Sequence, residues 1–388
     1  MDTKMNSTMK KESNKLYNKI FFWVFGIGYL AMILLNIATP KKEYSETEKR
    51  QLAKIPEFSV ADLLDGDYAR GLESWANDHF IFRDDWIKMK VTNEKMLGKT
   101  DSNGVYFCDD GYLIEQHKEE AFDAERMEKN KTFLKRFVDK FDDKLNINVV
   151  MIPTASEILT DKLPPFTTTF NQIKYNNEVK EIVGSGNYID VSETLKEHSD
   201  EYIYYKTDHH WTTLGAYYAY EEWARANGIE ALSQDAFEIE KATDNFLGTL
   251  HNKVNIDMEA DEMYIYKIKE NMDYKVTINM GSHVDQLYNY KALETKDKYE
   301  VYMYGNNGLI EVSTNVTNGK KLLVIKDSYS HSFNPFVINH YEETHIIDFR
   351  YFNANLSKYI EENGITDVLI MYNTINFVKD TNLVKFIG

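Results

Sequence analysis

The sequence contains little cysteine, proline and glycine for its length. Its 388 residues include one cysteine, Cys108, together with 6 prolines and 18 glycines. A single cysteine excludes an internal disulfide and a cysteine-based zinc site, and the other two counts exclude a collagen-like or linker-dominated chain. Hydrophobic residues make up 43% of the chain and charged residues 28%. The chain can therefore bury a sizeable core, and its length fits one large domain or two modest ones plus an extra element.

The chain has fewer positively than negatively charged residues, and the positive ones are unevenly distributed. It contains 45 Lys and Arg residues and 62 Asp and Glu residues, which gives a net charge of -17. This argues against nucleic acid as a partner, because such binding depends on a basic face that neutralises phosphates. The N-terminus is the exception, since two acidic residues there are outnumbered by five lysines, Lys4, Lys10, Lys11, Lys15 and Lys19.

A long uncharged run follows this basic tail. Residues 20–38 (IFFWVFGIGYLAMILLNIA) contain no charged side chain. As a helix they would extend roughly 28 Å, close to the thickness of a bilayer hydrocarbon core. We expect an uncleaved transmembrane anchor at 20–38, a cytoplasmic tail at 1–19 and an extracytoplasmic remainder. The alternatives are a cleaved signal peptide, which usually has a shorter apolar region and a small-residue cleavage site, and a buried core helix.

The rest of the chain alternates between helical and strand patterns. We expect a connector and a helical segment at 39–100, followed by an α/β domain at 101–388 with a β-rich insertion at about 229–320. Strands alternating with helices predict a largely parallel sheet flanked by helices on both faces. Helices are expected at about 60–98, 123–141 and 212–227, and short strands at 147–153, 187–191, 322–325, 344–349 and 367–372.

The first chemical signal is the segment KKLLVIKDSYSHSFNPF at 320–336. An apolar strand runs directly into Asp327 and Ser328, and Pro335 suggests a helix that begins a few residues later. In open α/β sheets, ligands bind at the carboxyl ends of strands, and backbone N–H groups there can stabilise an oxyanion. Ser328 is therefore a candidate nucleophile; the alternative is a serine that only caps a turn.

The second signal is YYKTDHHWTTLGAYYAY at 204–220, where Asp208, His209 and His210 are consecutive. An Asp two residues before a His can hold the imidazole tautomer and stabilise its cation, as the acid of a Ser-His-Asp triad does. A structural histidine pair and a metal site remain open as alternatives. Zinc would need three protein ligands, and the sequence shows no second His/Glu cluster at helical spacing.

The Thr-Asp-His-His-Trp run resembles the signature of the DHHW protein family, which belongs to the SGNH-hydrolase-like acetyltransferases together with the periplasmic alginate O-acetyltransferases. Several other segments are similar, so the resemblance covers the chain from residue 45 to the C-terminus. Those segments are SETEKRQLAKIPEF (45–58), NDHFIFRDDWI (77–87), VYFCDDGYLIE (105–115), VVMIPTASEIL (149–159), VIKDSYSHSF (324–333) and IIDFRYF (346–352).

The resemblance implies an SGNH-hydrolase-like fold with a permuted motif order, in which the Asp-x-His pair precedes the serine. It implies Ser328 as nucleophile, His210 as general base and Asp208 as the acid that orients it. Lys326 stands where the usual serine block has a glycine, and the separate Gly and Asn oxyanion donors have no match.

Three further residues are candidates for binding substrate. His209 adjoins the implied base, and Arg350 could bind substrate or pair with Asp348. Tyr205 belongs to a tyrosine-rich region whose rings could stack on sugars or pack in the core. No metal and no cofactor are expected.

These features predict a membrane-anchored, extracytoplasmic enzyme that transfers acetyl groups to a cell-surface polysaccharide. The resemblance implies a multi-pass membrane-bound O-acyltransferase (MBOAT) as the partner that supplies the acetyl group. A carbohydrate esterase with the same triad is one alternative. An inactive glycan-binding or scaffold protein of an envelope complex is the other.

Overall fold

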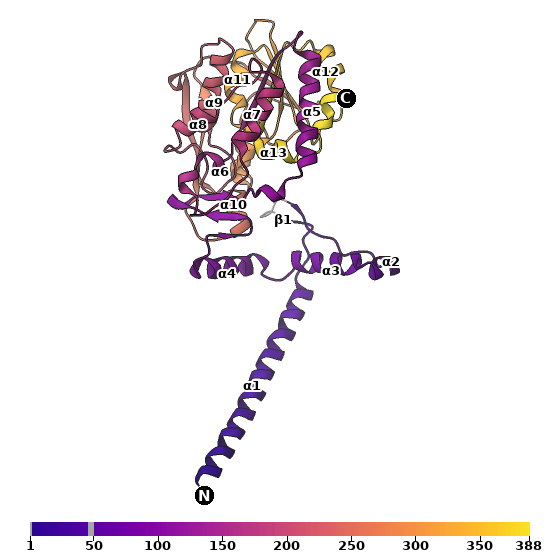
Figure 1. The fold of residues 1–388 in the computed structure, drawn as a ribbon, viewed down its shortest axis with the longest axis vertical. Helices are drawn as coiled ribbons and strands as arrows, with labels where there is room; N and C mark the ends of the chain where they lie inside the picture. Colours follow the sequence, from indigo (N-terminus) through magenta and orange to yellow (C-terminus); the bar gives the residue numbers. More distant parts are fainter. Residues whose placement is uncertain (1, 46–49) are drawn as a thin grey trace. The chain divides into compact units, whose positions relative to one another are not determined.

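The computed structural model describes residues 2–45 and 50–388, in two units that comprise Met1–Asn93 and Glu94–Gly388 (Figure 1). Residues 46–49 of the predicted connector lie outside the described residues. The predicted boundary near residue 100 between the helical segment and the α/β domain stays a prediction.

The first unit is helical. Helix α1 (Asp2–Ala38) contains the apolar segment Tyr17–Ala38, which is long and apolar enough to cross a membrane and of which no residue is buried. The predicted helix at 60–98 is divided into three, because Gly66 (φ 79°) and Phe82 (φ 56°) adopt left-handed backbone conformations that interrupt it. The three helices are α2 (Val60–Leu64), α3 (Asp67–Asp78) and α4 (Arg83–Met96). The short antiparallel pair β1 (Tyr44–Ser45) and β2 (Arg50–Gln51) lies between α1 and α2 in the sequence.

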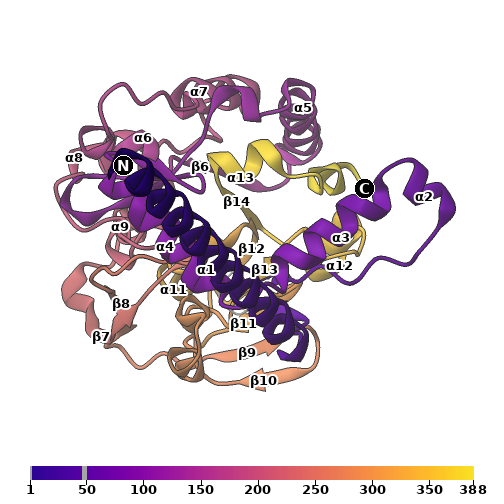
Figure 2. The same cartoon turned by 90° about the horizontal axis from the view of Figure 1, so that it is seen from below.

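The second unit is built on a mixed seven-stranded sheet with the order β10-β9-β11-β13-β12-β14-β6, which can be followed in Figure 2. Strand β12 pairs in parallel with β13 and β14, and β14 in parallel with β6. The pairs β13–β11, β11–β9 and β9–β10 are antiparallel. The prediction of a largely parallel sheet is therefore not confirmed; only the part around β12 is parallel. The strands are β6 (Asn146–Ile152), β9 (Lys275–Ile278), β10 (Ser282–Val284), β11 (Leu309–Ser313), β12 (Lys321–Lys326), β13 (Glu343–Ile347) and β14 (Asp367–Asn373).

Side chains that alternate along the central strands bury two separate cores. On β12, Leu322 and Val324 face a core shared with α9 (Thr213–Ala226) and α11 (Asn334–Val337), whereas Leu323 and Ile325 face a core on the other side. Buried strands that are apolar on both faces need helices on both faces, as predicted. The helices of the second core are α5 (Ala124–Phe141), α7 (Gln172–Val183), α12 (Leu356–Asn363) and α13 (Thr374–Lys379).

Most predicted elements are present, and one is wrong. The helix after Asp123 begins as expected, because this side chain accepts hydrogen bonds from the backbone N–H groups of Glu125 and Arg126. The predicted strand at 187–191 does not form; Tyr188 makes only an isolated bridge to Val149. The region 229–320 contains β7 (Phe237–Phe246), β8 (Asp261–Ile268), β9, β10 and β11. The remaining elements are β3 (Asp101–Ser102), β4 (Val105–Phe107), β5 (Leu113–Glu115), α6 (Ala155–Ile158), α8 (Ser192–Glu197) and α10 (Thr249–Val254).

Candidate active site

Ser328 lies at the carboxyl end of β12, between two parallel neighbours, as the sequence pattern predicts. The preceding residue, Asp327, is buried and fixes the turn. One oxygen of its carboxylate accepts a hydrogen bond from the backbone of Tyr329 at 2.9 Å, and the other accepts bonds from Asn373 and Asn376. Burial raises the pKa of Asp327 to about 6 against the opposing effect of these hydrogen bonds. This carboxylate thus ties the end of β12 to the end of β14.

The segment with Asp208, His209 and His210 is an irregular loop immediately before α9. Thr212 caps that helix, which the sequence predicts at 212–227, by accepting a hydrogen bond from the backbone of Gly215. At the other end of the loop, the buried carboxylate of Asp261 accepts hydrogen bonds from the backbone N–H groups of Lys206 and Thr207 and from the Thr207 hydroxyl. These contacts hold an irregular backbone in place.

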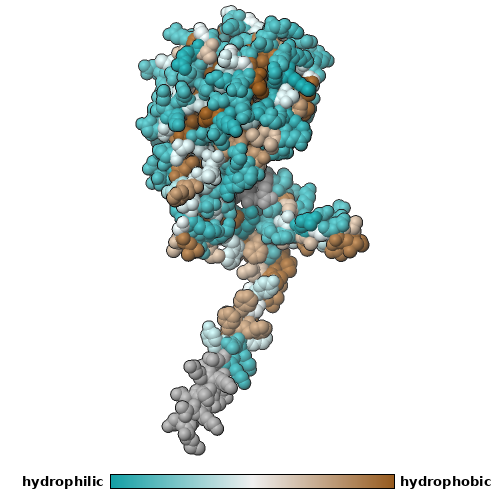
Figure 3. Space-filling model, viewed as in Figure 1, coloured by the Kyte–Doolittle hydropathy of each residue, from teal (hydrophilic) through white to brown (hydrophobic). Residues whose placement is uncertain are grey.

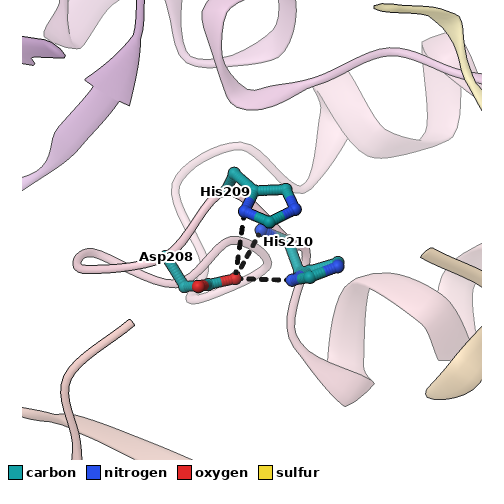
Figure 4. A group of neighbouring side chains, drawn as sticks. All are labelled: Asp208, His209 and His210. Carbon is teal, nitrogen blue, oxygen red and sulfur yellow. Dashed lines mark hydrogen bonds and ion pairs between the residues drawn. The ribbon is translucent and has the colours of Figure 1, made fainter. Parts of the chain in front are cut away.

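The structure brings Ser328, His210 and Asp208 together. The Ser328 hydroxyl lies 2.7 Å from His210 Nε2, and His210 Nδ1 lies 2.5 Å from Asp208 Oδ1. Since Nδ1–H donates to the carboxylate, Nε2 is left as the acceptor for the serine proton. The first distance is in the range expected of a nucleophile and its base, and the second is a short hydrogen bond to the group that orients the base. Figure 4 shows Asp208 and both histidines, with the Asp208 Oδ1 atom directed at the His210 ring.

Asp208 is held as a carboxylate. Its Oδ1 also accepts a hydrogen bond from the backbone of His210, and its Oδ2 accepts bonds from the backbone and the hydroxyl of Thr249. Burial alone would raise the pKa of Asp208, but the two imidazoles and these hydrogen bonds hold it well below its usual range. Gly248 passes so close that an added Cβ would lie 2.2 Å from the Asp208 Cβ. Only glycine fits there without displacing the acid.

Aromatic side chains fix His210 and connect the two loops. The His210 ring stacks on Tyr299 with ring centres 3.9 Å apart and an interplanar angle of 11°. Trp211 Nε1 donates to the carbonyl of Tyr329 at 2.8 Å, while the Tyr329 hydroxyl donates to the carbonyl of His209. These reciprocal bonds join the turn that carries Ser328 to the loop that carries His210.

The other predicted site residues lie in different surroundings. His209 is half-buried, and its Nδ1 lies 2.6 Å from the Thr249 hydroxyl. Arg350 forms the ion pair that was the alternative to substrate binding, with Nε 2.9 Å from Asp348 Oδ1. Tyr205 is 1% exposed and packs in the core, where its hydroxyl lies 3.3 Å from that of Tyr302. Binding of substrate by these three residues stays a prediction.

Lys326, the departure from the usual serine block, is buried, and its side chain contacts the far end of the turn Ser328–His331. Its Nζ lies 2.7 Å from His331 Nε2 and 3.2 Å from Asp348 Oδ2. Burial lowers the pKa of Lys326 to about 8 in spite of the opposing charge of Asp348. Lys326 therefore pairs with the buried carboxylate of Asp348, which the exposed Arg350 also contacts.

Within the described residues, Asp208, His209 and His210 form one group whose ligand atoms lie within 4.8 Å of one another. Each offers one atom to a metal ion, but Asp208 Oδ1 already accepts the His210 Nδ1–H and Thr249 occupies Oδ2 and His209 Nδ1. A metal bound through these atoms would have to displace these hydrogen bonds. Independence of metal stays a prediction.

Several site residues were missed by sequence reasoning. Thr249, Gly248, Tyr299 and Asn376 follow no motif with a fixed spacing, and they come from segments 40 or more positions from the residues that they contact. No local signal distinguishes these side chains, because their roles arise from tertiary contacts.

Comparison with models of protein families shows which family the chain belongs to. The sequence model of the DHHW protein family matches residues 128–347, more than half of the chain. The chain belongs to the DHHW family. The resemblance of the Thr207–Trp211 run to the family signature is thus confirmed. A comparison with curated proteins finds no match.

Solved structures share the fold of this DHHW protein. A DHHW family protein from Eubacterium siraeum is 24% identical and has a TM-score of 0.64, over 74% of this chain and 95% of that one. PatB1 from Bacillus cereus, solved with a sulfonyl adduct, is 21% identical with a TM-score of 0.61, over 73% and 97% of the two chains. The O-acetyltransferase domain of AlgJ from Pseudomonas putida is more distant, at 13% identity and a TM-score of 0.45 over 71% and 93%. At these identities the first two likenesses show a common mixed α/β fold.

Proposed function

We propose that this protein is a membrane-anchored, extracytoplasmic O-acetyltransferase that modifies a cell-surface polysaccharide through Ser328, His210 and Asp208. The observation that carries the proposal is the continuous hydrogen-bond chain from the Ser328 hydroxyl through His210 to Asp208, at 2.7 and 2.5 Å. Membership of the DHHW family supports the proposal.

In the first half of the reaction, Ser328 Oγ attacks the carbonyl carbon of an acetyl donor while His210 Nε2 removes the hydroxyl proton. Asp208 stabilises the imidazolium that forms. His210 then passes the proton to the leaving group of the donor, which departs as acetyl-serine forms. In the second half, His210 removes the proton of a glycan hydroxyl that attacks the acetyl-serine. The same proton returns to Ser328 Oγ as the serine leaves.

The source of the acetyl group is the reason for the proposed partner. An extracytoplasmic enzyme has no ready supply of cytoplasmic acetyl-coenzyme A, so a multi-pass MBOAT protein would deliver the acetyl group across the membrane. The apolar segment Tyr17–Ala38 would keep the two proteins in one membrane, where the effective concentration of each for the other is high. Deletion of a neighbouring MBOAT gene is therefore expected to abolish acetylation even when this protein is present.

The proposed nucleophile is tested by covalent labelling. A sulfonyl fluoride should modify Ser328 in the full-length protein, as peptide mass spectrometry would reveal, and Ser328→Ala should lose both the label and acetyl transfer. Ser330→Ala is the matched control, because Ser330 lies two residues away but is fully buried. Labelling that persists in Ser328→Ala would contradict the assignment. Label with release of acetate but no transfer to an oligosaccharide would favour the esterase.

A further inference from the structure

The first unit leaves an apolar face of α4 uncovered close to the end of the apolar helix. Phe82 lies immediately before the first residue of α4, and Trp86 and Met89, spaced i and i+3, share one side of the helix. Their exposed fractions are 63%, 40% and 49%, and the neighbouring Phe80 is 39% exposed. We call these four residues the α4 face. On the opposite side of α4, Val91 is fully buried, so the helix already has a packed side. A helix in water would not need a second apolar side.

Hydrogen bonds fix the depth of this face relative to α1. Asn36, two residues before the end of α1, accepts a hydrogen bond on its side-chain oxygen from the backbone N–H of Ile81 at 3.2 Å. Lys41 Nζ donates to the carbonyl of Asn36 at 2.7 Å and to that of His79 at 3.3 Å. His79 Nε2 also lies 2.9 Å from the carbonyl of Lys42. The chain at 79–81 is thus bound to the end of the apolar segment.

This attachment determines what surrounds the α4 face. Phe80 and Phe82 flank Ile81, so each is one Cα–Cα step of about 3.8 Å from the residue bonded to Asn36. Trp86 is also bound to Ile81, because its Nε1 donates to the Ile81 carbonyl at 3.1 Å. The interfacial layer on each side of a bilayer is roughly 5–8 Å thick. If Tyr17–Ala38 spans the bilayer, the aromatic side chains of the face lie within that layer.

We infer that α4 is an interfacial helix, whose α4 face inserts into the lipid surface where α1 leaves the membrane. Aromatic residues are enriched at this level because their rings are apolar while their edges tolerate water. Charged residues occupy other sides of the helix, including Asp84, whose side chain is 56% exposed. The lipid surface is the occupant, and the inference rests on the proposed anchor. Figure 3 shows hydrophobic side chains on α1 and around the short helices that follow it.

Spin labels can measure the depth of each side of α4 in the full-length protein. The single cysteine, Cys108, is replaced by serine, and one new cysteine is introduced per variant: Phe82→Cys, Met89→Cys, Asp84→Cys or Leu30→Cys. Each labelled protein is reconstituted into phospholipid nanodiscs, and collision rates with oxygen and with a water-soluble nickel chelate are compared. Retained circular dichroism shows that each variant is folded.

The oxygen-to-nickel ratio should be shifted toward lipid at positions 82 and 89 relative to position 84, the exposed control on the opposite side of the helix. Position 30 reports the anchor itself. A lipid-like ratio at 30 with water-like ratios at 82, 84 and 89 would overturn the interfacial helix and leave the anchor intact. Water-like ratios at all four positions would refute the anchor, and the inference with it.

A second measurement leaves the apolar face nearly intact. Brominated lipids quench tryptophans that lie in the bilayer, so Trp86→Phe should remove part of the quenching observed for the native protein. Trp223→Phe is the matched control, because Trp223 is fully buried in the second unit. Equal quenching of the native protein and Trp86→Phe would contradict insertion of the face.

Discussion

His210 has two ring nitrogens, and the neighbour of each one determines what the other can do. Because Asp208 accepts the Nδ1–H, the lone pair at Nε2 is directed at Ser328. Tyr299 covers one face of the ring and prevents it from rotating out of line. The low pKa of Asp208 keeps the negative charge that an imidazolium would need. At this scale, each residue matters through the geometry that it imposes on the next.

This mutual dependence predicts that the losses of activity in single variants of the triad do not add up in a double variant. Ser328→Ala and His210→Ala should each reduce kcat by about 10³-fold or more, and the double variant should be little worse, because members of a triad act as a unit. Asp208→Asn should retain at least as much activity as either. His209→Ala is the control and should be milder than His210→Ala, since His209 contacts Thr249. Single-turnover acetyl transfer measures all five; losses that multiply in the double variant would contradict the triad.

Lys326 makes a prediction about stability and pH. In the folded protein burial lowers its pKa from 10.5 to about 8. Between those values the unfolded chain binds more protons than the folded one, so this residue makes the free energy of unfolding rise with pH. The rise is about 3 kcal/mol at most. Urea unfolding in detergent should show the native protein gaining stability relative to Lys326→Met between pH 8 and 10.5. Parallel pH profiles for the two proteins would refute the lowered pKa.

At the scale of elements, the site depends on a loop and a helix that come very close together. The start of α10 supplies Thr249 to Asp208, and the closeness is possible only because residue 248 has no side chain. Gly248→Ala should displace Asp208 or α10, cost about 1–3 kcal/mol of stability and reduce acetyl transfer. Gly186→Ala is the matched control, since an added Cβ there meets nothing within 4 Å. Full activity of Gly248→Ala in a kinetic assay would show that Asp208 does not need its observed position.

Sequence patterns predicted the elements that have strong local signals. The helix after Asp123, the helix after Thr212 and the strands β12 and β13, which precede and follow Ser328 in the sequence, follow from spacing and side-chain type. The strand predicted at 187–191 failed because its β-propensity was not matched by strand partners. The antiparallel half of the sheet was missed because strand direction depends on long-range pairing. The contacts of Gly248 with Asp208 and of Tyr299 with His210 were missed as well, because they too join residues far apart in the sequence.

At the scale of the whole molecule, charge and hydropathy are separated along the chain. The N-terminal lysines, the apolar segment Tyr17–Ala38 and an acidic remainder follow one another in that order. The α4 face and the proposed MBOAT partner both require that the apolar segment stays attached and remains in the membrane. A cleaved signal peptide would release the second unit and leave it without either contact.

Topology can be tested on intact cells. A helix of 22 residues is about 33 Å long and can cross the hydrocarbon core, and the lysines before it should keep the N-terminus in the cytoplasm. An N-terminal epitope should therefore stay in the membrane fraction and resist protease added outside, whereas a C-terminal epitope should be digested. Replacing the N-terminal lysines with glutamates should weaken this orientation, since the positive charge sets it. A cleaved signal would leave the C-terminal epitope without the N-terminal one, and full-length protein in the soluble cytosol would refute the anchor.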